Sequence, residues 1–185
     1  MKVTINANGK TVQAEISEGQ LKELGLVEQL KKLGLLEDKP RTGYEGREEC
    51  NNKKHYFVNT IDLVIEDENT VLFDQNRYDV GNYYSDKTIA ENNARADRLL
   101  RQLRQWQAQN DEPISISDWK NEGIIKYFIA YNYRSSLFEI GRCSRRREPN
   151  IIYFTTKDKA SKAVKNFRDE LEWYFTEYQQ RLDEE

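Results

Sequence analysis

The chain has 185 residues and a formal net charge of −3, and 33% of its residues are charged. No apolar run approaches the roughly 20 residues of a membrane-spanning helix, and residues 1–5 alternate polar and apolar types unlike a secretory signal, so we expect a soluble intracellular protein with no membrane partner. Two cysteines, three prolines and nine glycines exclude a disulfide framework and a low-complexity chain, whereas eleven tyrosines make the chain rich in aromatic residues.

Residues 3–16 predict a β-hairpin, because apolar residues alternate on both sides of Asn8-Gly9, a turn pair that tolerates positive φ. Ser17 and Gln20 have the spacing of a capping box, so a helical segment should follow directly. We assign residues 1–40 to this hairpin and helix.

The rest of the chain contains a weak internal repeat after a polar linker, 41–55. The aromatic strand start Tyr56-Phe57-Val58 recurs as Tyr127-Phe128-Ile129, and each is followed by further short strands and a long helix. We therefore expect a first β-β-(β)-α unit at 56–112 and a second at 113–185.

Both expected long helices are amphipathic. Apolar residues recur at helical spacing in 86–109 and in 157–182, in the series Ile89, Ala96, Leu99, Leu103, Trp106 and Ala160, Val164, Phe167, Leu171, Tyr174, Tyr178. Such a helix covers one face of a small antiparallel sheet, so the sequence predicts an α+β fold: an N-terminal β-hairpin plus helix, then two similar units of short antiparallel strands, each followed by a long amphipathic helix. The aromatics of these stripes should be core residues, and the C-terminal helix also offers a face for a homodimer.

Motifs for catalysis or a cofactor are missing from the sequence, which has no Gly-rich phosphate loop, nucleophile elbow or zinc spacing. His55 is the single histidine, and its position at a strand entrance favours a surface residue over a catalytic base. The spacing of the carboxylates that could hold a divalent metal matches no standard metal-binding loop, and residues 66–69 fit a hairpin turn better; these candidates are Asp62, Glu66, Asp67, Glu68, Asp74 and Asp79. We therefore predict no cofactor and no metal, and a binding protein in preference to an enzyme.

The arginines form two groups. One lies on the expected helix 86–109, at a three-residue spacing that spreads its members over a broad face: Arg95, Arg98, Arg101 and Arg104. The other falls at an expected hairpin tip between 138–140 and 151–153: Arg142, Arg145, Arg146 and Arg147. Guanidinium groups on a loop bind phosphates or carboxylates in a bidentate manner, so this second group is the better candidate for contacting a partner. The alternative is that both groups are ordinary solvated surfaces.

Residues 76–91, NRYDVGNYYSDKTIAE, carry a recognisable pattern: an expected strand of the form NRY-x-x-GN-aromatic, after an acidic turn and before the start of a helix. This segment resembles one that is common in small phage and mobile-element proteins of Gram-positive bacteria, a family that includes type II-A anti-CRISPR proteins. The strand at 152–155 and the N-terminal hairpin are similar as well, so the resemblance covers most of the chain.

The resemblance implies a Cas9 inhibitor in the cytoplasm of a bacterial host, which interferes with the guide RNA or with the Cas9–guide RNA complex. Its partners would be Cas9, the single guide RNA, or both. The residues that would contact RNA are Arg142, Arg145, Arg146, Arg147, Arg95, Arg98 and Arg101, and the acidic residues that would face Cas9 are Asp62, Glu66, Asp67 and Glu68. Two alternatives stay open: a small ribonuclease or nuclease-inducing factor that truncates the guide RNA, and a mobile-element structural or regulatory protein unrelated to CRISPR.

Overall fold

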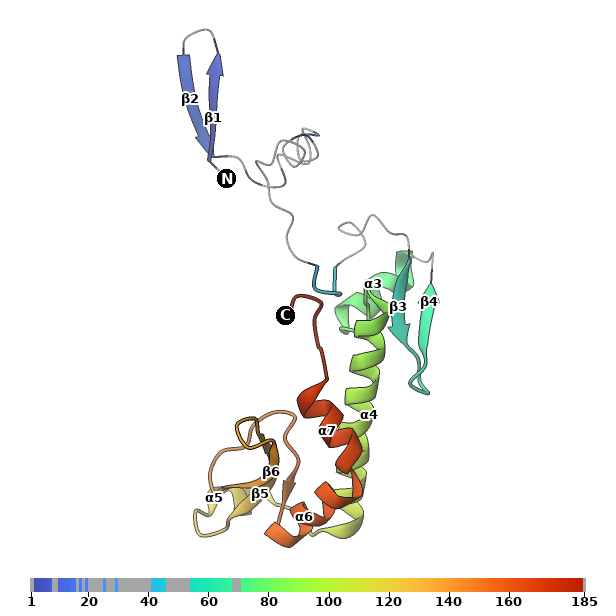
Figure 1. Ribbon diagram of the computed structural model, residues 1–185, viewed down its shortest axis with the longest axis vertical. Coiled ribbons are helices and arrows are strands. Elements are labelled where there is room, and N and C mark those ends of the chain that lie inside the picture. Colours follow the sequence, from blue (N-terminus) through green and yellow to red (C-terminus); the bar gives the residue numbers. More distant parts are fainter. Residues whose placement is uncertain are drawn as a thin grey trace. The chain divides into compact units, whose positions relative to one another are not determined.

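A computed structural model describes residues 2–7, 10–15, 41–45, 54–67 and 71–184, together with Ser17, Gly19, Gly25 and Gln29. For residues 2–7, 10–15, 67 and 71–74 it describes the backbone alone. The chain divides into two compact units, Met1–Pro40 and Arg41–Glu185 (Figure 1).

The first unit contains the predicted hairpin. Strand β1 (Lys2–Ala7) pairs antiparallel with β2 (Lys10–Glu15), and Ile5 lies opposite Val12. The alternation of apolar residues therefore gives the expected pair of strands. The helix predicted after Ser17 falls outside the described residues, apart from a few single positions.

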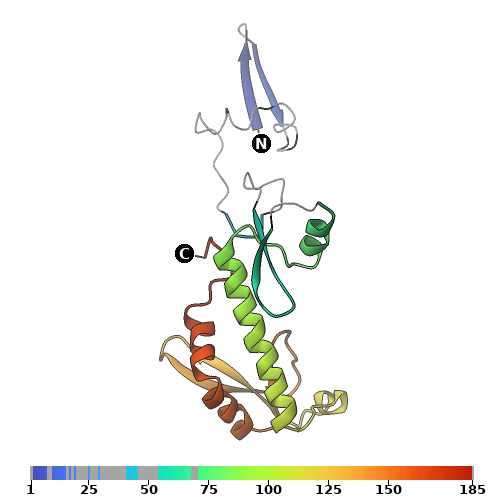
Figure 2. The ribbon, with the colours of Figure 1, turned by 90° about the vertical axis from the view of Figure 1, so that its right-hand side faces the viewer.

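The second unit is built along one long helix, α4 (Lys87–Asn110). A two-stranded sheet of β3 (His55–Val58) and β4 (Val64–Asp67) lies at its N-terminal end, with helix α3 (Val71–Asp79). At its C-terminal end lies a three-stranded sheet (Figure 2). This sheet, which we call the second sheet, contains β5 (Lys126–Asn132), β6 (Leu137–Cys143) and β7 (Tyr153–Phe154). The helices beside it in the chain are α5 (Ile116–Lys120), α6 (Lys157–Asn166) and α7 (Arg168–Thr176).

All described strand pairs are antiparallel, so the α+β class predicted from the sequence is confirmed. The three-stranded sheet has the order β6-β5-β7, and β3 is bridged on its free side by Tyr84, which pairs with Tyr56. None of the helices in the described part of the chain combines the length and the apolar composition that a bilayer span requires.

Helix α4 begins and ends within one residue of its predicted range, 86–109. Its N-cap is Asp86, whose carboxylate accepts a hydrogen bond from the backbone N–H of Ile89 at 3.1 Å. Asp is among the best residues at this position, because its side chain satisfies an amide that has no partner inside the helix. Of the predicted apolar stripe, Ile89, Ala96, Leu99 and Leu103 are buried.

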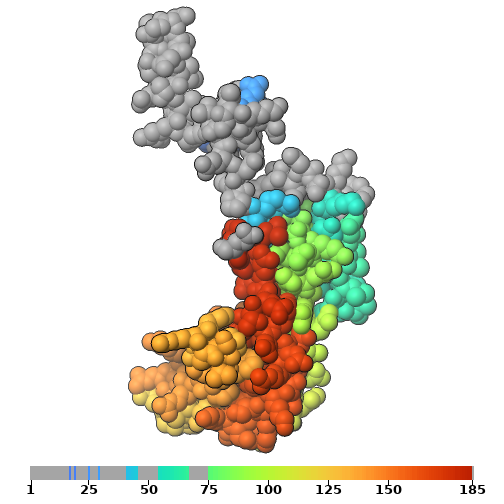
Figure 3. Space-filling view, in the orientation of Figure 1, coloured from blue at the N-terminus to red at the C-terminus, as the bar shows by residue number. Residues whose placement is uncertain are grey.

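Two hydrophobic cores lie along α4. At its N-terminal end, buried Tyr84, Ile89 and Ala90 pack together. At its C-terminal end the core joins α4 to the second sheet and to the C-terminal helices; its buried members are Leu99, Leu103, Phe154, Ala160, Ala163 and Leu171. In the space-filling view the C-terminal helices close against the strands of this sheet (Figure 3). Trp106, Phe167 and Tyr174 pack against this second core, in agreement with the sequence.

The prediction of a strand at the start of 76–84 is wrong, because Asn76, Arg77 and Tyr78 belong to helix α3. The helix ends at Asp79 and is followed by Gly81, whose φ is 72°, and the backbone N–H of Asn82 donates to the carbonyl of Arg77 at 2.8 Å. Glycine is the usual residue for this left-handed helix end. Only after this turn does the chain become extended, at Tyr83 and Tyr84.

The turn predicted at 66–69 is also misplaced, since Glu66 and Asp67 lie in strand β4. The chain instead reverses at 59–63, where the side chain of Asn59 accepts backbone N–H groups of Ile61 and Leu63 at 3.0 and 2.9 Å. Asp62 adopts a φ of 61° in this turn. Asn and Asp are the side chains that support such local bonds and such φ values.

The single helix predicted at 157–182 is broken at Phe167, which has a φ of −117° and a ψ of 25°. The break lets α6 lie on the strands of the second sheet while α7 packs along α4. Beyond α7 the chain is not helical, and Leu182 packs against the first core. The apolar stripe that suggested a dimer face is thus used inside the unit, with Leu171 and Trp173 buried; a homodimer stays a prediction.

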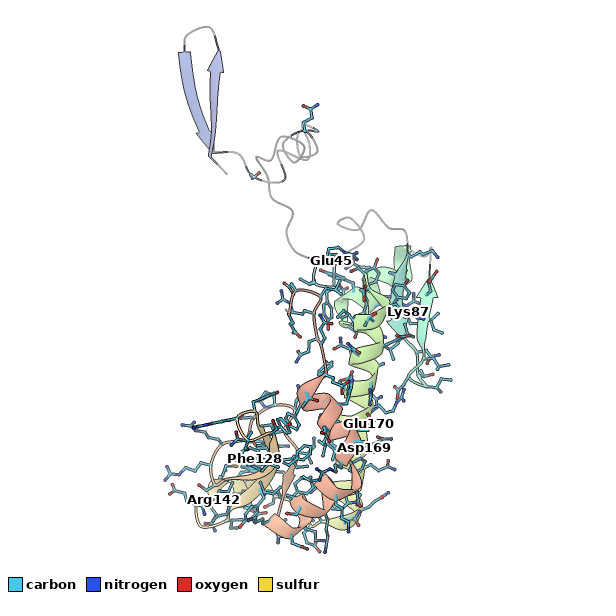
Figure 4. All side chains as sticks on the ribbon, in the orientation of Figure 1. Glu45, Lys87, Phe128, Arg142, Asp169 and Glu170 are labelled. Atoms are coloured by element: carbon cyan, nitrogen blue, oxygen red, sulfur yellow. The ribbon has the colours of Figure 1, made fainter. Side chains whose placement is uncertain are left out.

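Residues 41–45 are attached to the start of α4, and Figure 4 shows Glu45 beside it. The backbone N–H of Ser85 donates to the carbonyl of Gly43 at 2.9 Å. The carboxylate of Glu45 accepts hydrogen bonds from the hydroxyls of Ser85 and Thr42 and from the backbone N–H groups of Thr42 and Gly43. Burial raises the pKa of Glu45, but these hydrogen bonds outweigh it and bring the pKa down to about 2.

Replacing Glu45 with glutamine should remove an acid-sensitive part of the stability. The pKa of Glu45 falls from an ordinary value of 4.5 to about 2 on folding, so the ionised carboxylate stabilises the fold above pH 4.5, and this contribution is lost as the pH falls towards 2. Between pH 7 and pH 3, urea unfolding should show a loss of stability that is larger for wild type than for Glu45→Gln, by at most about 2 kcal/mol. Exposed Glu112→Gln is the control, and parallel pH profiles for wild type and Glu45→Gln would contradict the assignment.

Candidate functional site

The arginines of α4 are engaged within the chain. Arg95 forms a bidentate pair with Glu170 of α7, with Nε and Nη2 at 2.9 and 3.1 Å from the two carboxylate oxygens. Its guanidinium carbon also lies 3.9 Å from the centre of the Trp173 ring. Both contacts fix the guanidinium plane, so Arg95 joins α4 to α7.

Arg98 and Arg101 both bind Asp62, in the turn between β3 and β4. Their closest nitrogen–oxygen distances to the Asp62 carboxylate are 3.2 and 2.6 Å. The structure therefore brings together predicted RNA-facing arginines and a predicted Cas9-facing acid, which neutralise one another. Each such partly exposed pair contributes about 1 kcal/mol or less, and their role here is to hold the β3–β4 turn on α4.

Among the other acidic candidates, Glu66 accepts a hydrogen bond from the ammonium of Lys54 at 2.6 Å. This hydrogen bond lowers the pKa of Glu66. The side chain of Asp67 and all of Glu68 lie outside the described residues. Within the described part of the chain, no three His, Cys, Asp or Glu side chains are placed to hold one metal ion.

His55 is buried, and the expectation that it lies on the surface is wrong. Its side chain is 3% exposed. The imidazole stacks on Tyr83, with ring centres 4.5 Å apart and an interplanar angle of 14°. His55 therefore contributes to the packing around the β3-β4 sheet.

The second group of arginines, in residues 142–147, forms what we call the basic loop. Arg142 is the second-last residue of β6, and the other three lie in the connection to β7. This connection is not the predicted hairpin tip, because β6 and β7 lie on opposite sides of β5 and do not pair. The chain has to cross the sheet between them, and this places all four arginine side chains on the exposed surface.

The basic loop has few internal partners for its charges. Arg145 forms an ion pair with Glu122, and the guanidinium carbon of Arg147 lies 5.9 Å from the centre of the Trp119 ring. Among the described residues, no carboxylate is paired with Arg142, Arg146 or Arg147. Figure 4 shows Arg142 on the second sheet, and Glu170, the partner of Arg95, on α7. Arg142, Arg146 and Arg147 are therefore available to bind an external anion, unlike Arg95.

The aromatic residues Trp119, Phe128 and Tyr153 pack together next to the basic loop. Tyr153 packs edge-to-face on Trp119 and on Phe128, with ring centres 4.9 and 5.9 Å apart. Its hydroxyl accepts a hydrogen bond from the backbone N–H of Glu148 at 3.0 Å, and burial raises its pKa. Burial likewise raises the pKa of the Cys143 thiol, whose sulfur donates to the carbonyl of Arg146 at 3.3 Å.

Sequence reasoning missed two residues of this region. Lys126 is fully buried, and its ammonium is bound by carbonyls of the surrounding backbone. Trp119 contacts Lys126, Arg147 and Tyr153. A lysine at the start of an apolar strand looks like a solvated strand end, so only the pairing of distant segments reveals its burial.

The site offers electrostatic and hydrogen-bonding contacts in place of a reactive centre. Its guanidinium groups present planar donors suited to phosphate oxygens. Burial keeps the thiol and the phenol at this site protonated near neutral pH. No protein-family model, curated protein or solved structure matches the chain.

Proposed function

We propose that this protein binds the phosphate backbone of RNA through the basic loop. One observation carries the proposal: four exposed arginines are clustered in residues 142–147, and Arg145 alone is ion-paired with a described carboxylate. Arginine forks on an exposed loop bind phosphates without reading sequence. By contrast, Arg95, Arg98 and Arg101 are already paired, and we no longer assign them to the RNA contact.

The resemblance of residues 76–91 to the phage and mobile-element family supports a more specific partner. On this basis we propose an anti-CRISPR protein that inhibits a type II-A Cas9 in the bacterial cytoplasm by engaging its guide RNA. Guide RNA in such a complex is held largely through its backbone, so a protein that binds backbone phosphates competes with Cas9 for it. The protein acts here as a binding partner, and the guide RNA stays intact.

The test compares two triple charge reversals with the same change in net charge. Arg142, Arg146 and Arg147 are changed to glutamate in one variant, and exposed Lys157, Lys162 and Lys165 of α6 in the other. We expect the loop variant to lose roughly 100-fold in affinity for guide RNA, and its slope of log affinity against log salt to fall by about 2, because three phosphate contacts are lost. The α6 variant should bind with nearly wild-type affinity.

Fluorescence anisotropy of labelled guide RNA measures the affinities. A Cas9 cleavage assay with the same variants tests the partner, and a denaturing gel of the incubated RNA tests for cleavage. Equal affinities for the two variants would refute the basic loop as the RNA site. Full Cas9 activity beside tight RNA binding would refute the partner, and shortened RNA would favour a ribonuclease.

A further inference from the structure

Lys126 is one of the most deeply buried side chains in the described part of the chain, with an exposed fraction of 0%. Its ammonium donates hydrogen bonds to three backbone carbonyls: those of Asp118, Ile124 at 2.8 Å and Ser144 at 2.9 Å. The ammonium also lies 4.9 Å from the centre of the Trp119 ring. All three of its donors are therefore used by the backbone.

Burying the ammonium of Lys126 costs free energy, and the arrangement is stable only when all three carbonyls accept its hydrogen bonds. An ammonium removed from water loses its hydration, and three carbonyls and an aromatic face replace that hydration here. Removing the ammonium would leave three inward-facing carbonyls without their partner, each a buried acceptor with a cost of its own. The three segments that supply the carbonyls are thus held to one another through Lys126.

Each of these segments carries a contact of the basic loop. The Ser144 carbonyl directly precedes Arg145 in the loop. The Ile124 carbonyl lies two residues after Glu122, the ion-pair partner of Arg145. The Asp118 carbonyl directly precedes Trp119, the ring beside Arg147. One buried cation therefore ties the loop to the two elements that its arginines touch.

The far end of the loop is also anchored. Ile152 packs against the second core, and the backbone N–H of Glu148 donates to the hydroxyl of buried Tyr153 at 3.0 Å. The arginine-bearing part thus lies between two attached ends. If the hydrogen bond between Lys126 and the Ser144 carbonyl were lost, only one end of the arginine-bearing segment would remain attached.

We propose that Lys126 is the positioning residue of the basic loop, which fixes the guanidinium groups in the arrangement that binds the RNA backbone. The role in RNA binding rests on the proposed function, whereas the anchoring of the loop does not. A preorganised loop binds more tightly because less conformational entropy is lost on binding. Lys126 itself, being buried, touches no phosphate.

The first experiment measures the anchoring without RNA. Trypsin cleaves after arginine, so the loop carries its own cleavage sites at Arg145, Arg146 and Arg147. We expect Lys126→Met to be cut in this loop on the order of tenfold faster than wild type, because cleavage follows the local opening of the segment. Exposed Lys120→Met also removes one lysine and should be cut at the wild-type rate. Equal rates for all three proteins would overturn the anchoring.

Variants are compared at equal distance below their melting temperatures, so that a general loss of stability does not pass for loop opening. If Lys126→Met does not fold, Lys126→Gln, which keeps two N–H donors, takes its place. Cleavage sites are read by mass spectrometry. Faster cleavage spread over all exposed lysines and arginines, instead of concentrated in the loop, would reduce Lys126 to a general stabilising residue and overturn the proposal.

The second experiment is a double-mutant cycle with guide RNA. Lys126→Met should weaken RNA binding by roughly tenfold in the wild-type background and have a much smaller effect in the background of the loop triple reversal, in which Arg145 is the one loop arginine left for it to position. An equal loss in both backgrounds, or a loss in neither, would overturn the positioning role. If wild type binds no RNA, the proposed function fails, and the trypsin comparison alone decides whether Lys126 anchors the loop.

Discussion

Replacing Gly43 with alanine is expected to lower the free energy of unfolding of the second unit by about 3 kcal/mol, because a positive φ and a steric clash add together. The φ of Gly43 is 91°, in the region that residues with a Cβ rarely adopt. A Cβ at this position would lie 2.7 Å from Cγ1 of Ile89, which is 0% exposed and cannot move aside. Thermal and urea unfolding measure the loss.

Gly81→Ala is the matched control for this prediction. Gly81 has a similar φ of 72°, but nothing lies within 4 Å of a Cβ built on it. It therefore isolates the backbone strain, which costs about 1 kcal/mol. If Gly43→Ala and Gly81→Ala were equally destabilising, the close approach of the 41–45 segment to Ile89 would not exist in solution.

The other large effect is expected at Phe154, in the short strand β7. Its side chain is 0% exposed, belongs to the second core and meets the Trp106 ring edge-to-face at 6.0 Å. Truncation to alanine removes most of a buried ring and leaves a cavity among α4, α6 and β5. We expect a loss of about 4 kcal/mol and a fall in melting temperature of about 10 °C.

Leu137→Ala tests the specificity of this prediction, because Leu137 lies in the same sheet but is 61% exposed. Its truncation should change the stability by less than about 0.5 kcal/mol. Calorimetry of both variants gives the comparison. A small loss for Phe154→Ala would mean that β7 is not packed between α4 and α6, and the crossing of the basic loop over the sheet would then need another explanation.

Short-range patterns in the sequence were sufficient to predict strands β1 and β2 and helix α4. The alternation around Asn8-Gly9 predicted β1 and β2, and the apolar stripe behind Asp86 predicted α4 to within one residue at each end. These patterns work because strand and helix periodicity, turn residues and caps act over a few neighbouring positions. The α+β class followed from the same short-range information.

Short-range patterns failed where a distant contact outweighed them. Apolar residues keep helical spacing over 157–182 in the sequence. In the structure the helix nevertheless breaks at Phe167, because α6 packs on the β6-β5-β7 sheet and α7 packs on α4. Residues 76–78 looked like a strand, but they belong to α3, which ends at Asp79 and is followed by the left-handed turn at Gly81. In the first of these cases packing against other elements decided the backbone conformation.

The candidate site divides in the same way. Composition and spacing were enough to single out Arg142–Arg147 as a concentrated positive charge, since charge is a property of the residues alone. Which arginines are paired was decided by the tertiary structure, which brings Asp62 to Arg98 and Arg101, and Glu170 to Arg95. Ion pairs between residues far apart in the chain depend on distances that only the folded backbone sets.

The excess of aromatic residues and the net charge of −3 were plain from the sequence, and the helical spacing of the aromatics predicted that they are core residues. The burial of Lys126 was not, because three carbonyls from separate segments have to converge before an ammonium can leave water. Periodicity and charge can be determined from the sequence, whereas polar groups from distant segments meet only once the chain has folded.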